Sequence, residues 1–170
     1  MPQGGFIYFS VTGLDTTLRR IPTWGLNIST LAPAWSLIAE DLRDDTRQQF
    51  SQQGGYFGKG SRWDKLRPAT VKDRIRKGYN GPSPIEYRTG YLYYSLTEKG
   101  SPDNVEIITP NSLTVGTTWY IAGYQHFGTP HMAARQLLGI RYRRRSLIVQ
   151  RLGDYVIAEA RKVGLDTHGK

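Results

Sequence analysis

Few side chains in this sequence are suited to catalysis. His126 and His131 lie on either side of a Gly-Thr-Pro break, and the third histidine is His168. Their separation is not the i, i+4 spacing of a zinc-binding pair on a helix. The sequence contains neither an HExxH motif nor a Gly-x-Ser-x-Gly nucleophile turn. We therefore expect neither a metal centre nor a nucleophilic hydrolase.

A cluster of aspartates offers a second kind of chemistry, because paired carboxylates can hold Mg²⁺ in a nuclease. Asp41, Asp44 and Asp45 lie on one predicted helix, opposite its apolar stripe and beside Arg43 and Arg47. Such mixed charge is typical of a solvated helix face. No phosphate-binding glycine loop of the Walker type occurs. We expect no cofactor and no enzymatic activity.

Positive charge is segregated along the chain, whose formal net charge is +9. The stretch 59–77 carries eight lysines and arginines against two aspartates, and 135–151 carries six arginines and no acid. Segregated positive charge indicates a negatively charged partner, either nucleic acid or an acidic protein surface. A solvated surface is the alternative for each cluster.

The densest basic run is the strongest candidate for a contact with DNA or an acidic partner. It consists of Arg141, Tyr142, Arg143, Arg144 and Arg145, just before the last predicted helix. Arginines with an interleaved tyrosine can neutralise phosphates and stack on bases. Because no recognised DNA-reading or RNA-reading motif accompanies the run, any such contact would be independent of base sequence.

Length and composition favour one domain over residues 1–170. The chain has no cysteine, which excludes disulfides, thiol nucleophiles and thiolate metal sites. No apolar run approaches the roughly 20 residues that span a bilayer. We expect a soluble protein without a membrane partner, made in the cytoplasm.

Periodicity and turn residues predict the elements. Apolar residues recur at helical spacing over 30–52 and 146–163, which predicts two longer helices. A hairpin is predicted where Pro110-Asn111 separates two β-branched segments. The complete prediction is a strand at 6–12 within an N-terminal arm (1–28), helix 30–52, an extended basic loop (54–87) containing a short helix 69–77, short helix 89–96, strands 105–109 and 112–116, short helix 119–127, helix 146–163 and a frayed tail (164–170). This order predicts an α+β fold, with a small antiparallel sheet packed against two longer helices.

Four segments of the sequence resemble patterns of one protein family. They are Trp63–Thr70 with the following lysine ("W-x-x-L-x-P-x-T"), Arg88–Ser95 ("TG-x-L-x-x-S"), Tyr120–Gly128 ("YA-x-x-HQ-x-G") and Met132–Gly139 ("MPAR-x-F-L-G"). In this order, and followed by a long helix, they resemble the virion morphogenesis or tail-completion proteins of Mu-like and P2-like tailed phages. In the third segment Gln125 and His126 are reversed and one residue is inserted, and in the last segment Ala133 replaces the usual proline.

The resemblance implies a structural protein of the virion. Proteins of this kind form a ring, commonly a hexamer, at the head–tail junction. The ring completes the tail, and it contacts the head connector or head-closure protein on one side and the tail tube or terminator on the other. Genome DNA passing through such a ring could meet the basic residues without sequence-specific contacts.

The resembling segments also imply which residues form subunit or ring–ring interfaces. Large apolar side chains, turn glycines and a planar arginine suit such contacts. Ordinary packing within the chain is the alternative for each of them. The candidates are Trp63, Leu66, Pro68, Thr89, Gly90, Tyr120, Phe127, Met132 and Arg135.

Overall fold

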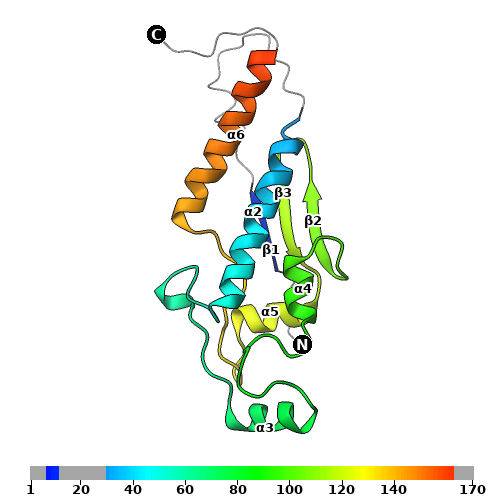
Figure 1. Cartoon of the computed structure of the whole chain (residues 1–170), viewed down its shortest axis with the longest axis vertical. Coiled ribbons are helices and arrows are strands. Elements are labelled where there is room, and N and C mark those ends of the chain that lie inside the picture. The colour runs from blue at the N-terminus through cyan, green and yellow to red at the C-terminus, as the bar shows by residue number, and fades with distance from the viewer. Residues whose placement is uncertain (1–6, 12–29, 163–170) are drawn as a thin grey trace.

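The structure of the chain, a computed structural model, describes residues 7–11 and 30–162 (Figure 1). It has the predicted α+β class, with a three-stranded antiparallel sheet packed against helices. The elements are β1 (Ile7–Val11), α2 (Ala32–Ser51), a 3₁₀ turn (Lys59–Ser61), α3 (Pro68–Arg76), α4 (Tyr91–Thr97), β2 (Asn104–Ile108), β3 (Leu113–Thr117), α5 (Tyr120–Phe127) and α6 (Tyr142–Lys162). The predicted arm beyond β1 and the predicted tail at 164–170 lie outside the described residues.

The sheet has the order β1-β3-β2 and is antiparallel throughout. The hairpin prediction is confirmed: β2 and β3 pair from Ile108 opposite Leu113 to Asn104 opposite Thr117. The turn closes through a hydrogen bond from the Thr109 amide to the Ser112 carbonyl, at 2.9 Å. β3 is the central strand, and four of its five residues are buried.

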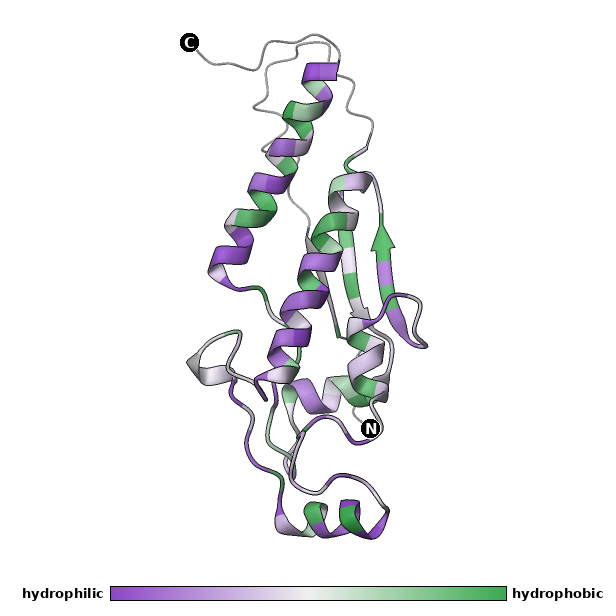
Figure 2. Cartoon of the chain, viewed as in Figure 1, coloured by the Kyte–Doolittle hydropathy of each residue, from purple (hydrophilic) through white to green (hydrophobic). Residues whose placement is uncertain are grey.

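Two helices cover the sheet directly and a third joins the same core. α2 and α4 pack against the strands, and α6 packs along α2 (Figure 1). Along both α2 and α6, hydrophobic and hydrophilic stretches alternate, as expected for amphipathic helices (Figure 2). Trp35 and Ile38 of α2, Leu113 of β3, and Ile148 and Leu152 of α6 are buried in one cluster. In the described residues, no helix is long and apolar enough to cross a membrane.

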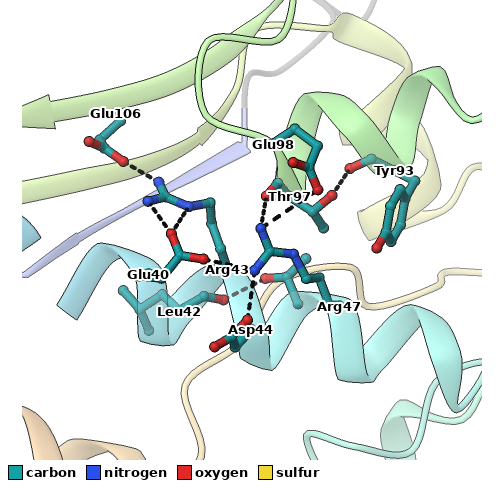
Figure 3. Close-up of polar contacts among 10 residues, drawn as sticks. Glu40, Leu42, Arg43, Asp44, Arg47, Tyr93, Thr97, Glu98 and Glu106 are labelled. Atoms are coloured by element: carbon teal, nitrogen blue, oxygen red, sulfur yellow. Dashed lines mark hydrogen bonds and ion pairs between the residues drawn. The ribbon is translucent and has the colours of Figure 1, made fainter. Parts of the chain in front are cut away.

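A polar network fixes α2 against β2 and α4 (Figure 3). Arg43 is buried and pairs with both Glu40 of its own helix and Glu106 of β2. One turn later, Arg47 donates to the Thr97 carbonyl at the end of α4, at 2.8 Å. Because these guanidinium groups connect three elements, they orient the helix as well as neutralise its carboxylates.

The last helix begins at Tyr142, and the prediction that it begins near Ser146 is wrong. The arginine run is therefore the first turn of α6, and not a loop before it. Arg144 in this turn pairs with Asp41 and Asp45 of α2, at 3.3 and 2.6 Å. These ion pairs with α2 offset the unfavourable placement of basic residues at a helix N-terminus.

The interpretation of the α2 aspartates as a solvated face is also wrong in part. Asp45 is 1% exposed and lies against α6, whereas the side chain of Asp44 is 60% exposed. Asp41 is also largely covered, since Arg144 and Arg151 of α6 both reach it. Two of the three carboxylates therefore pair with arginines of α6, whereas exposed Asp44 pairs with Arg47 of its own helix.

The basic loop at 54–87 contains the predicted short helix, α3, and is anchored to the chain's own core. Trp63 is 5% exposed and packs edge-on against Phe50 of α2, with ring centroids 5.2 Å apart. Buried Gln49 accepts hydrogen bonds from the Tyr56 and Phe57 amides at 2.9 and 3.3 Å. The loop lacks a core of its own, but α2 supplies one.

Candidate binding groove

The described part of the chain contains a groove of about 770 Å³. It lies where the basic loop meets the lower end of the molecule in Figure 1, near α3, α4 and α5. Residues from 64–74, 79–92, 119–125 and 131–135 line it. Segments far apart in the sequence therefore form one site.

All four segments that carry the family resemblance contribute to this groove. Leu66 comes from the first, Thr89 and Gly90 from the second, and Met132 and Arg135 from the last. The third segment contributes through α5, which forms part of one wall. The groove therefore brings together five of the predicted interface residues.

The other four predicted interface residues lie around the groove or beneath it. Trp63 is buried in the core, and its indole N–H donates to the Gln136 carbonyl at 3.0 Å. Pro68 starts α3 and is exposed. Tyr120 and Phe127, at the two ends of α5, are 54% and 70% exposed. Of these four, only Pro68, Tyr120 and Phe127 are accessible to a partner.

Gly90 shapes one edge of the groove because only glycine fits its position. Its backbone φ is +82°, in the left-handed region, directly before α4. A Cβ atom there would lie 2.7 Å from a ring carbon of Tyr94 and 3.1 Å from Tyr87. The next residue, Tyr91, packs edge-on against Trp119 at 4.8 Å, and both rings line the groove.

A buried ion pair forms part of the groove wall. Arg135 is 7% exposed and contacts Glu86, also 7% exposed, at 3.2 Å. The same guanidinium donates to the Asp64 carbonyl at 3.3 Å. Arg135 therefore holds the loop at two points, consistent with the alternative of packing within the chain.

Arg74 of α3 is the second buried guanidinium of the wall, at 6% exposure. It donates to the Pro84 carbonyl at 2.9 Å and also to the Ile85 carbonyl. Burial lowers the pKa of Arg74, because removal from water penalises its charge. Burial likewise raises the pKa of the Glu86 carboxyl, against the opposing effect of Arg135 and Arg74.

The arginines predicted to contact DNA or an acidic partner have different environments. Arg144 is engaged with the α2 aspartates. Arg141 lies over the ring of Tyr56, 4.6 Å from its centroid, as in a cation–π contact. Arg143 and Arg145 are exposed on α6. This run therefore offers fewer free charges than its sequence indicates.

The histidines do not form a metal site in the described residues, among which no metal-binding group of three ligands occurs. The Nδ1 atom of His126 accepts a hydrogen bond from the Leu137 amide at 3.3 Å. Burial lowers its pKa and so favours the neutral imidazole. His131 is exposed at the groove, while His168 lies outside the described residues.

Arg74 and Glu86 are site residues that the sequence-based prediction missed. Arg74 lies among Lys72, Asp73 and Arg76, a pattern typical of a solvated helix. Glu86 did give a signal, because it is the sole acidic residue between Asp73 and Glu98 in a strongly basic region. An isolated carboxylate in such a region indicates an ion-pair partner.

Comparisons of the chain with protein-family models, with curated proteins and with solved structures found no match. The groove and the surfaces around it are therefore interpreted from their own geometry, together with the sequence patterns that meet there.

Proposed function

We propose that this chain is a structural, non-enzymatic subunit of a tailed-phage virion. In this role it assembles into a ring at the head–tail junction, completes the tail and joins it to the head connector. One observation carries the proposal: the four segments that resemble the tail-completion family line one groove, although the first and the last lie more than 60 residues apart. Chance matches scattered through a sequence would have no reason to converge in space.

The exposed surface supports assembly, because a closed ring needs two different patches on each subunit. Large apolar side chains are exposed on separate elements. Tyr120 and Phe127 lie on α5, Val149 on α6 is 65% exposed, and Ile107 on edge strand β2 is 56% exposed. Apolar exposure at several separate places suits a subunit with a neighbour on each side.

Among the predicted interface residues, we assign the contacts to those that are accessible. Trp63 and Arg135 are buried within the chain, so their role is to hold the basic loop in place. Phe127 and Tyr120 are free to bury against a neighbour, and aromatic side chains of this kind contribute strongly to interfaces.

A basic nucleic-acid-binding module is the second candidate. The observation that favours it is the exposure of Arg62, Arg67, Lys72 and Arg76 in the basic loop, together with Arg143 and Arg145 on α6. Against it, Arg74, Arg135 and Arg144 have partners within the chain. We prefer the structural role, since the arginines buried within the chain contribute less to a DNA-facing surface.

The test is the mass of the purified protein by light scattering, with negative-stain images, alone and with phage tails or connectors. Rings are expected. Phe127→Ser should abolish them, whereas Leu37→Ser should not; Leu37 is 58% exposed on α2 and controls for surface hydrophobicity. A monomer that does not bind phage tails or connectors, but binds DNA with a steep salt dependence, would favour the second candidate.

A further inference from the structure

Two buried guanidinium groups in the groove wall retain unused hydrogen-bonding capacity. Arg74 and Arg135 are 6% and 7% exposed, and both line the groove. In the described part of the chain, the Nε atom of each is buried without a hydrogen-bond partner. Buried N–H groups are nearly always paired in folded proteins, and both of these unpaired ones belong to residues that line the same groove.

The charges around these two guanidinium groups also favour an anionic ligand. Arg135 has Glu86 as its partner, but the hydrogen bonds of Arg74 go to the neutral carbonyls of Pro84 and Ile85. Two buried cations therefore share one buried carboxylate. Because burial raises the pKa of Glu86, even this compensation is weakened. A buried charge is costly unless it is paired, and an anion in the groove would pair it.

The remainder of the groove limits what kind of anion fits. Its volume of about 770 Å³ lies within the range of ligand pockets, about 300–1,000 Å³. Apolar and aromatic side chains form much of the wall, among them Leu66, Tyr91, Trp119 and Met132. The lining also contains Asp64 and Asp73, which would repel a chain of phosphates. The groove suits an extended segment with one acidic group among apolar ones.

We propose that this groove binds an extended acidic peptide segment of a partner protein, with a carboxylate of that segment pairing with Arg74 and Arg135. Arginine suits this task, because its planar guanidinium matches a carboxylate. Exposed Lys65, Arg67 and Arg88 at the groove attract the segment, and the apolar walls take its neighbouring side chains. The inference is independent of ring formation, because peptide binding can be measured whatever the oligomeric state of the chain.

The test uses a positional-scanning library of acetylated hexapeptides, with binding to the full chain measured by fluorescence anisotropy. The best binders are expected to contain an aspartate or glutamate next to aliphatic or aromatic residues. Replacing that acid with its amide should weaken binding at least tenfold. In NMR spectra, the amides of Gly90, Ala133 and Arg135 should shift on titration. Equal binding of acid and amide peptides, no acidic binder, or shifts elsewhere would overturn the proposal.

Two variants test the location without touching the buried arginines. Ala133→Trp fills the groove from an exposed position, and Ala158→Trp on the exposed side of α6 is its control. Arg88→Glu reverses an exposed charge at the groove, and Arg143→Glu reverses one on α6. Only the groove variants should lose binding, by at least tenfold, with unchanged melting temperature. Unchanged peptide binding by Ala133→Trp would refute the site, and displacement of the peptide by a tighter-binding oligodeoxynucleotide would identify it as a phosphate site.

Discussion

Arg144 of α6 donates two hydrogen bonds to the carboxylate of Asp45 of α2, at 2.8 and 2.6 Å. The pair is largely buried, with side-chain exposures of 16% and 2%. Asp41 lies beside it and receives Arg151 from the next turns of α6, at 2.6 Å. The two long helices are therefore held in register by ion pairs as well as by their apolar stripes.

Removing one partner of the Arg144–Asp45 pair should destabilise the fold strongly. In Arg144→Met the Asp45 carboxylate stays buried without its main partner, and such changes typically cost about 3–5 kcal/mol. Urea denaturation followed by circular dichroism measures the loss. Exposed Arg143→Met in the same helical turn is the control, with an expected change within about 0.5 kcal/mol. Similar stabilities of the two variants would contradict a structural role for the pair.

Gly90 should tolerate alanine less well than Gly78 does. Their φ angles are similar, +82° and +75°, so both changes carry the cost of a left-handed alanine, about 1–2 kcal/mol. At Gly78 the added Cβ would meet no atom within 4 Å, but at Gly90 it would lie 2.7 Å from Tyr94. Thermal unfolding of both variants should therefore show a larger loss for Gly90→Ala. An equal loss would mean that Tyr94 moves aside freely.

The elements were predictable because their signals are local. Apolar residues at helical spacing gave α2, and Pro110-Asn111 between β-branched segments gave the β2–β3 hairpin. The start of α6 was not predictable in this way. Its first four residues are Tyr142 and three arginines, which show no apolar periodicity. This turn is held by the hydrogen bonds of Arg144 to Asp45, which lies 99 residues earlier in the sequence.

Part of the candidate site was predictable in its members, but the roles of those residues were not. Leu66, Gly90 and Met132 do line one groove. However, the local sequence does not determine whether a large side chain points into the core or towards solvent. Trp63 and Arg135 turn inward because Gln136 and Glu86 supply their polar partners. Those partners lie 73 and 49 residues away in sequence, so only the tertiary fold assigns them.

The stability of the protein should depend on pH through Glu86. Burial raises the pKa of its carboxyl above the ordinary value of 4.5, so the folded state binds this proton more tightly than the unfolded chain does. The stabilising contribution is therefore complete below about pH 4.5 and is lost as pH rises through the folded-state pKa. The glutamine side chain of Glu86→Gln does not ionise, so this variant should not lose stability in this way as pH rises.

Urea denaturation of wild type and Glu86→Gln across this pH range gives the difference in their free energies of unfolding. The difference should move in favour of Glu86→Gln as pH rises, and then level off above the folded-state pKa. A difference that moves the opposite way would mean that Arg135, 3.2 Å away, outweighs burial and lowers the pKa instead.

Gln49 is the polar anchor of the basic loop, and its replacement should loosen that loop. It is fully buried, accepts hydrogen bonds from the Tyr56 and Phe57 amides, and donates to the Gln136 carbonyl at 2.7 Å. Gln49→Met has a similar length but leaves these backbone groups unpaired, at about 1–3 kcal/mol for each one that stays buried. Exposed Gln52→Met is the matched control. Hydrogen exchange at the Tyr56 and Phe57 amides should accelerate only in Gln49→Met, because these amides then lack their acceptor. Equal protection in both variants would show that the Trp63 contacts alone hold the loop in place.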